Sequence, residues 1–467
     1  MSTGSAGPGT GKSPTRRGVL AGGLIALGAA ACGSSGTGKP APARSSGASP
    51  TPSLRPSAIP SQAPRPGSLP NPMLPAGTDT LPEIEHIVVL MMENHSYDNY
   101  LGMLRRGDGF TLDASGRPTA ANRDASGRSV RAYHMTSTCQ LAKKPSQAWD
   151  ASHIQYDDGR NDGFVRSDSG PVSMGYWEQQ DLPFYYGLAN TFPLADRYFS
   201  SVLAQTYPNR RFLLAGTAYG LVDNRISSVT APGPPNGTIF ERLNQHSITW
   251  KNYFSSLATC LLVNGIHQAN PDKLVPIAEF FKDAAAGTLP SYSLVDPDFE
   301  KSSEENPQNI LVGEAFAASV INAVMNSPLW PKTLLVWCYD EHGGYYDHVP
   351  PPAALAPDSI APVIAPQKQP GGYDRYGFRV PAVIVSPRAR RNYVSHVVHD
   401  HTSILKLIET KWNLPALTYR DSAASNLLDS IDLTGTPAFL EPPTLPAPNQ
   451  DPKALACTAP PAPPDAI

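Results

Sequence analysis

The chain has 467 residues, 50 of them proline, and a formal net charge of −3 at neutral pH. A charge so near zero argues against nucleic acid as a partner, since nucleic-acid-binding surfaces are strongly basic. The length is enough for one large hydrophobic core, and we expect a single folded domain over residues 81–436.

Residues 1–32 have the pattern of an export signal. Arg16 and Arg17 precede an apolar run that is shorter than the ~20 residues needed to cross a bilayer. Twin arginines direct the export of folded proteins, so we expect this route. The run ends in alanines before Cys32, which is similar to a lipoprotein cleavage site. We therefore expect either a cell-surface lipoprotein anchored to the membrane through Cys32 or, after ordinary cleavage, a secreted protein.

Two proline-rich segments flank the expected domain. Residues 33–80 contain much Pro, Ser, Gly and Ala, and too few apolar side chains to offset the entropy of folding, which predicts a flexible linker. Residues 437–467 form a Pro-rich tail. The cysteines beyond Cys32 show no CxxC spacing, so the sequence gives no sign of a zinc ribbon, and it does not reveal their pairing.

The domain opens with an apolar run over residues 84–92, which is typical of a central parallel strand. Glu93 and Asn94 follow directly, so a buried strand delivers a carboxylate and an amide to its carboxyl end. In open α/β sheets, ligands bind at that edge. The alternative for Glu93 is an incidental position beside a helix that Asn94 caps.

The next stretches carry histidines in sequence that predicts loops. His134 and His153 are of this kind, and a lone histidine is usually structural unless the fold brings it to a site. Residues 161–165 predict a turn into a short strand, and residues 181–190 predict a short helix.

Thr206 precedes a predicted helix over residues 209–216, with Pro208 suited to its first turn and Gly216 to its end. The amide groups and dipole at a helix N-terminus favour phosphate binding. A threonine hydroxyl placed against a metal ion is a competent nucleophile. A helix-capping role for Thr206 is an equally good interpretation at this point.

Further regular elements follow. Residues 248–253 and 291–295 predict strands, and residues 313–325 have the apolar spacing of a helix. This helix should pack on the sheet just before the next strand.

That strand, over residues 333–337, leads into the adjacent carboxylates Asp340 and Glu341. An unpaired charge buried at the end of a strand costs several kcal/mol, on the order of 5. Together with Glu93 and Asn94 these side chains would form an all-oxygen site for one hard or borderline divalent metal ion of unspecified identity. A charged loop that caps the strand is the alternative interpretation.

The last elements are a core strand over residues 380–385 and a helix over residues 404–412, which Asp400 should cap. Cys338 lies in the strand before Asp340 and is expected to be a small buried apolar side chain. Strands that alternate with helices throughout predict an α/β sandwich with a central, mainly parallel sheet flanked by helices.

Four blocks in order are similar to those of the bacterial phosphoesterase family that contains non-specific phospholipase C and metal-dependent acid phosphatases. These blocks are residues 93–98, 206–210, 340–351 and 400–403. The resemblance covers roughly residues 82–415 and implies an alkaline-phosphatase-like fold.

The resemblance also implies roles for single residues. The metal ligands would be Glu93, Asn94, Asp340, Glu341 and Thr206, with Thr206 also the nucleophile. His153 and His348 would be catalytic, and Asn94, His134 and His342 would bind substrate. One departure stands out, because Glu305-Asn306-Pro307 replaces the Glu-His-Pro of many relatives and an imidazole that protonates the leaving group is missing there.

We therefore expect an exported, metal-dependent phosphoesterase that hydrolyses phosphate esters through a threonine nucleophile. A phospholipase C acting on phospholipid is the first expectation, and an acid phosphatase acting on monoesters is the second. A lipid-anchored protein that only binds phosphate esters would need the metal site but not Thr206.

Overall fold

The computed structural model describes residues 65–140 and 144–457. The predicted export signal and Cys32 lie outside the described residues. Within the described residues, no helix is long and apolar enough to cross a membrane.

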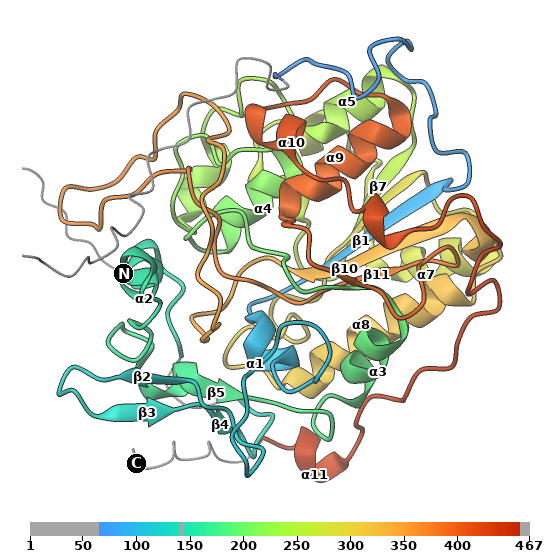
Figure 1. The fold of residues 1–467 in the computed structure, drawn as a ribbon. Coiled ribbons are helices and arrows are strands. Elements are labelled where there is room, and N and C mark those ends of the chain that lie inside the picture. The colour runs from blue at the N-terminus through green and yellow to red at the C-terminus, as the bar shows by residue number, and fades with distance from the viewer. Residues whose placement is uncertain (1–64, 141–143, 458–467) are drawn as a thin grey trace, which may run out of the picture. The chain divides into compact units, whose positions relative to one another are not determined.

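An eight-stranded sheet forms the centre of the molecule, in the order β12-β6-β11-β10-β1-β9-β7-β8 (Figure 1). Neighbouring strands are parallel except where β11 pairs with β10 and β6. The strands are β1 His86–Met92, β6 Leu194–Ala195, β7 Trp250–Phe254, β8 Leu274–Pro276, β9 Tyr292–Val295, β10 Thr333–Tyr339, β11 Ala382–Val385 and β12 Val394–Ser395. The prediction of a mainly parallel sheet is confirmed.

Helices cover both faces of this sheet (Figure 1). One face carries α4 Thr206–Ala215, α5 Ile239–Gln245, α9 His401–Trp412 and α10 Tyr419–Ala423. The other carries α3 Pro183–Thr191, α7 Ile277–Ala286 and α8 Ile310–Met325. The α/β sandwich expected from the alternation of strands and helices is therefore present.

Smaller elements complete the described chain. The short helices are α1 Tyr97–Leu101, α2 Trp149–Tyr156, α6 Ile266–Ala269 and α11 Pro452–Leu455. Two small sheets pair β2 Ala121–Arg123 with β3 Ser129–Arg131, and β4 Tyr133–His134 with β5 Gly175–Tyr176. The 3₁₀ turns are η1 Asp157–Gly159, η2 Gly170–Met174, η3 Ile226–Thr230, η4 Thr259–Leu262, η5 Trp330–Lys332 and η6 Leu428–Ser430.

The register of the two central strands decides where the polar residues after them lie. β1 and β10 pair in parallel with Met92 opposite Tyr339, and the Asp340 N–H donates to the Met92 carbonyl at 3.2 Å. Both strands are almost entirely buried because helices cover both faces of the sheet, which explains their continuous apolar runs. Glu93 and Asp340 therefore leave the sheet side by side.

Most predicted elements are confirmed, with differences around α2. Asp400 and Ser403 form a capping box at α9, and α4 ends at Gly216 in the left-handed conformation. Residues 161–163 are irregular and residues 164–165 lie in a turn, so the predicted strand is absent here. Gly163 packs tightly on α2, where a Cβ would lie 1.7 Å from the Ile154 carbonyl oxygen. His153 lies within α2 and not in a loop.

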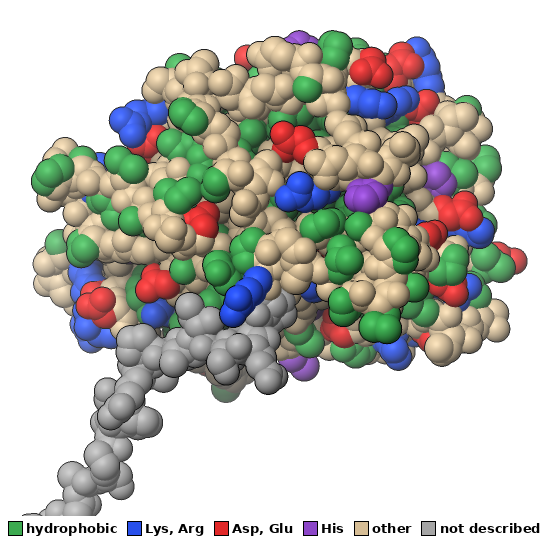
Figure 2. Space-filling model, turned by 90° about the horizontal axis from the view of Figure 1, so that it is seen from above, with side chains coloured by type: hydrophobic (Ala, Val, Ile, Leu, Met, Phe, Trp, Pro, Cys, Tyr) green, Lys and Arg blue, Asp and Glu red, His purple; other side chains and the backbone are tan. Residues whose placement is uncertain are grey.

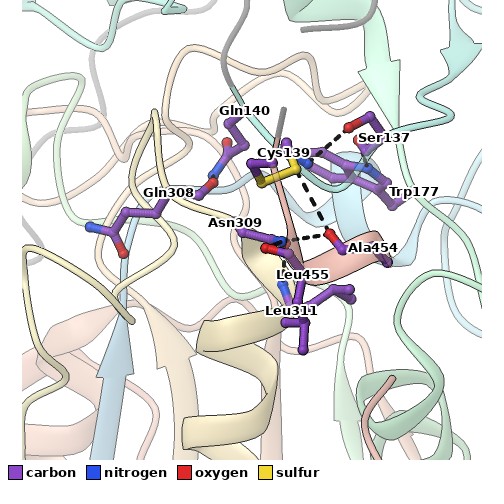
Figure 3. The surroundings of a disulfide bond; sticks show 10 residues. Ser137, Cys139, Gln140, Trp177, Gln308, Asn309, Leu311, Ala454 and Leu455 are labelled. Atoms are coloured by element: carbon purple, nitrogen blue, oxygen red, sulfur yellow. Dashed lines mark hydrogen bonds between the residues drawn. A yellow bond between two sulfur atoms is a disulfide. The ribbon is translucent and has the colours of Figure 1, made fainter. Parts of the chain in front are cut away.

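The two segments next to the predicted domain make contacts with it. Asn413 at the end of α9 donates its side-chain amide to the carbonyls of Asn71, Leu74 and Pro75. At the other end, a disulfide joins Cys139 to Cys457 beside the start of α8, where the Asn309 amide donates to the Ala454 carbonyl at 2.9 Å (Figure 3). Cys260 and Cys338 are free and buried, as predicted for Cys338.

The surface visible in Figure 2 mixes acidic, basic and apolar side chains without a large area of one kind. This pattern on the described residues agrees with the near-neutral composition of the chain.

Candidate active site

The candidate site lies where β1 and β10 end. The segments that follow approach each other so closely that a Cβ on Gly343 would lie 1.9 Å from the Asn94 carbonyl oxygen. Gly343 also has a φ of +65°, a conformation that glycine adopts without strain. Glycine at this position therefore lets Glu93 and Asn94 meet Asp340 and Glu341.

Three oxygen atoms meet in this contact. The Asn94 Oδ1 position lies 2.7 Å from Asp340 Oδ1 and 2.9 Å from Glu341 Oε1, so only acceptors face one another. Two arrangements satisfy them. The amide can turn its NH₂ group toward both carboxylates, or a cation can bind among the oxygens. The donor set therefore fits a hard metal ion.

Thr206 is the first residue of α4, and its side chain is buried beside this contact. Its hydroxyl donates to Asn94 Oδ1 at 3.5 Å. Gln205 holds the N-cap position, so Thr206 does not cap the helix. The helix start offers fewer free amides than expected, because the Tyr207 N–H donates to Asn224 Oδ1 at 2.8 Å and Pro208 has no N–H.

Arg210, one helical turn after Thr206, is a buried charged residue of the site for which the sequence predicted no role. Its buried guanidinium donates from Nε to Asp340 Oδ2 at 2.9 Å and lies 3.4 Å from Asp296 and 3.8 Å from Glu93. Asp296 directly follows β9, and its place after a buried strand is the same signal that identified Asp340. The i, i+4 spacing from Thr206 was the available signal for Arg210.

The electrostatics favour a further positive charge. Burial, reinforced by the Asp340 carboxylate, raises the pKa of Glu93 and of Glu341 well above the ordinary range. Burial also raises the pKa of Asp340 to about 6, although Arg210 opposes the shift. Arg210 alone leaves these carboxylates undercompensated, and a divalent cation would lower their pKa values again.

A cavity of about 180 Å³ opens beside Thr206 and is lined by Glu93, Arg210 and Glu305 together with apolar side chains. Glu305 belongs to the segment that departs from the family pattern. Asn306 does not line the cavity, because it accepts from the Tyr345 hydroxyl at 3.2 Å and donates to the Gln140 carbonyl. At this segment, therefore, the Glu305 carboxyl group lines the cavity beside Thr206, and Asn306, which replaces the histidine of many relatives, does not.

The predicted histidines lie elsewhere, and none of them lines this cavity. His342 is buried behind Glu341 and contacts Gln155 Oε1 at 2.7 Å, and burial lowers its pKa to about 3. His134 pairs with Asp181 at 2.7 Å, which raises its pKa. The substrate-binding roles of both stay predictions.

His153 lines a separate cavity of about 610 Å³ together with Leu203 and Gly371. Its Nδ1 contacts the Trp149 carbonyl at 2.7 Å, and burial lowers its pKa. Leu203 lies three positions before Thr206 in the chain, so the two cavities border the same segment. The catalytic role of His153 stays a prediction.

His348 belongs to a second acidic cluster with Asp98 and Asp347, whose ligand atoms are close enough to hold a metal ion. Arg379, however, donates to Asp347 at 2.8 Å and lies 3.2 Å from Asp98. His348 contacts Asp98 at 2.7 Å. Because a buried guanidinium already supplies positive charge there, we interpret this cluster as an ion-pair network that holds the loops after β1 and β10 together.

Comparison with known proteins places the chain among phosphoesterases. The Phosphoesterase family matches residues 84–415. Phospholipase C B of Mycobacterium tuberculosis is 30% identical, with 79% of this chain and 81% of the relative covered. Non-specific phospholipase C6 of Arabidopsis thaliana is also 30% identical, with 78% of this chain and 75% of the relative covered.

A solved protein of the alkaline phosphatase superfamily from Vibrio parahaemolyticus overlaps 70% of this chain and 76% of its own, with 10% identity and a TM-score of 0.35. The family match spans all the elements that build the site, from β1 to α9. The chain therefore belongs to the Phosphoesterase family and is a hydrolase acting on phosphoric ester bonds.

Proposed function

We propose that this protein is a metal-dependent phosphoesterase of the phospholipase C type that uses Thr206 as its nucleophile. The observation that carries the proposal is that Asn94 contacts Asp340 and Glu341 and also the Thr206 hydroxyl, while Thr206 and Glu93 line one cavity. The names of the relatives support the substrate class, because they are phospholipases C from bacteria and plants.

One divalent cation would be held by Glu93, Asn94, Asp340 and Glu341, with Thr206 beside it. When bound, it would supply Lewis-acid chemistry that lowers the pKa of a hydroxyl and neutralises phosphate charge. Arg210 has a positioning role, because it fixes the orientation of Asp340 and lies close to Glu93.

The chain's own residues then account for the transfer. Thr206 Oγ1 attacks phosphorus, a new oxygen–phosphorus bond forms, and the bond to the departing alcohol breaks, which leaves a phosphothreonine. Glu305 can take the threonine proton and return it to the leaving alkoxide, because it lines the same cavity. The Glu305 carboxylate also pairs with Lys144. His153 and His348 do not line that cavity, and the catalytic roles predicted for them stay predictions. Water then hydrolyses the bond between phosphorus and Thr206 Oγ1, which restores the threonine hydroxyl and releases a phosphomonoester from a diester substrate or phosphate from a monoester.

We also propose that the protein is exported through its twin-arginine segment and acts at the cell surface or outside the cell. The disulfide between Cys139 and Cys457 supports this proposal, because disulfides persist mainly in oxidising compartments. Intact-mass analysis of the membrane fraction would test the lipid anchor, and a mature chain that begins beyond Cys32 would contradict it.

The decisive experiment measures turnover of phosphatidylcholine and of p-nitrophenyl phosphate across a panel of divalent metals. We expect diacylglycerol release, and we expect Thr206→Ala to lower turnover by about 10³-fold or more because the nucleophile is lost. Thr206→Ser serves as the matched control, since it keeps a hydroxyl at the same position and should retain measurable turnover.

Circular dichroism of both variants checks that the fold is intact. Near-normal turnover by Thr206→Ala would contradict the covalent step. Hydrolysis of the monoester without diacylglycerol release would assign the enzyme to the acid phosphatases instead.

A further inference from the structure

A second cavity adjoins the one that contains Thr206. It has a volume of about 310 Å³ and shares three lining residues with the first cavity, namely Tyr207, Leu257 and Leu262. Tyr207 directly follows Thr206 at the start of α4. The two cavities are therefore neighbours, with Tyr207, Leu257 and Leu262 between them.

The second cavity is lined mainly by apolar side chains, with Thr230, Asn264, His267 and Gln268 as its polar lining residues. Among the described residues, no Asp, Glu, Lys or Arg lines it, whereas Val229, Leu261 and Val263 do. Ile226 stands at its rim with 73% of its surface exposed, and Leu257 is 38% exposed. Exposed aliphatic side chains beside an apolar cavity favour an apolar ligand over a solvated headgroup.

The walls of this cavity are tied to the helix that carries Thr206. Arg211, buried on α4, donates to the Leu262 carbonyl of η4 at 3.2 Å and to the Ser228 hydroxyl of η3 at 2.9 Å. Both walls are therefore fixed relative to the nucleophile before any ligand arrives. A cavity held open in this way loses little entropy when it is filled.

We infer that the cavity bordered by η3, η4 and α6 binds one acyl chain of a diacyl phosphoester while its phosphate is held at Thr206. This inference deepens the proposed function and rests on it. Burial of one methylene group strengthens binding about fourfold. The preference of the enzyme for a substrate should therefore grow steeply with the length of its acyl chain. The residues of η3 and η4 that line the cavity would thus determine the specificity for acyl-chain length.

The test uses dibutanoyl and dihexanoyl phosphatidylcholine, both kept monomeric, and compares kcat/KM in the full-length protein. The wild type should prefer the longer substrate by about 15-fold if two methylene groups of one chain are buried. In Ile226→Asp and in Leu261→Asp this preference should fall below about threefold. Leu440→Asp, a matched change at a 50% exposed leucine that lines neither cavity, should keep the full preference.

Binding provides a readout that does not depend on turnover. Calorimetry with dihexanoylglycerol should show weaker binding to both cavity variants than to the wild type and to Leu440→Asp. Equal affinity, or an unchanged chain-length preference in both variants, would overturn the inference. The inference would also be overturned if the cavity variants lowered turnover only with phospholipid vesicles. That result would show that the exposed side chains at the rim of the cavity contact the bilayer and that the cavity does not bind a single acyl chain.

Failure of the proposed function has a different signature. In that case the wild type hydrolyses neither phosphatidylcholine. The difference in calorimetric affinity between the wild type and the cavity variants still decides whether the apolar cavity binds an acyl chain.

Discussion

Arg210 shows how much of the site depends on a single side chain. Replacement by Met keeps much of its volume but leaves Asp340, Asp296 and Glu93 buried without their counter-charge. We expect Arg210→Met to lower the free energy of unfolding by about 3–5 kcal/mol, as when one partner of a buried ion pair is removed. Urea unfolding measures this, and Arg225→Met, at an exposed ion pair, should change stability by less than about 1 kcal/mol. Equal effects of the two variants would contradict the role of Arg210.

His348 gives a prediction about pH. Burial disfavours the charged imidazole, but the Asp98 carboxylate outweighs burial and raises the pKa of His348 to about 9. The folded protein therefore holds this proton above pH 6.5, where the unfolded chain releases it. Its stabilising contribution is complete below pH 6.5 and is lost as the pH rises toward 9.

The variant His348→Gln should therefore show a smaller drop in melting temperature between pH 6.5 and pH 9 than the wild type. Thermal unfolding followed by circular dichroism across this range makes the measurement. Parallel curves for the two proteins would show that Asp98 does not hold the proton on His348.

At the scale of elements, the approach of the segments after β1 and β10 is the feature that assembles the site. Gly343→Ala adds a Cβ that would lie 1.9 Å from the Asn94 carbonyl oxygen, so the strand ends must separate. We expect this variant to lose most of its turnover. Its free energy of unfolding should fall by more than about 2 kcal/mol in total, which exceeds the roughly 1–2 kcal/mol that the left-handed backbone alone costs an alanine.

The chain offers a matched control for Gly343→Ala. Gly127 also has a positive φ, of +86°, but a Cβ there would meet nothing within 4 Å. Gly127→Ala therefore isolates the backbone cost, and it should leave turnover unchanged. If both variants behave alike in unfolding and turnover assays, the close approach at Asn94 has no special importance.

The elements also show what a sequence can and cannot predict. The runs before Glu93 and Asp340 are apolar without alternation, which identified buried parallel strands, and their parallel pairing followed from the fold class. The residues between the strands gave no comparable signal. Loop lengths do not reveal that His134, His342 and His348 each pair with a residue that is distant in the sequence, because those contacts depend on how the chain folds back.

Arg210 and Glu305 were missed for a related reason. Each becomes visible only when α4 and the loop before α8 are placed against the ends of β1 and β10. The carboxylates after the strands were predictable because the carboxyl ends of parallel strands lie at the same edge of a sheet. No such rule predicts that the Arg210 guanidinium reaches these carboxylates from a helix.

At the scale of the whole molecule, metal removal tests the centre without altering the chain. We expect prolonged dialysis against EDTA to abolish turnover and a divalent cation to restore it. The fold should survive, because the Asn94 amide can turn its NH₂ group toward Asp340 and Glu341 and satisfy both carboxylates. Circular dichroism before and after dialysis provides the control. Full turnover in the dialysed protein, with metal absent by elemental analysis, would contradict metal dependence.

The bond between Cys139 and Cys457 joins residues 318 positions apart, so it encircles the segment that carries Thr206, Arg210, Glu305 and Asp340. A protease that cuts one peptide bond within this span produces two fragments that stay covalently attached. Such a nicked enzyme would migrate as one band until a reducing agent separates the pieces. A single cleavage within this span therefore leaves the two parts of the chain joined to each other.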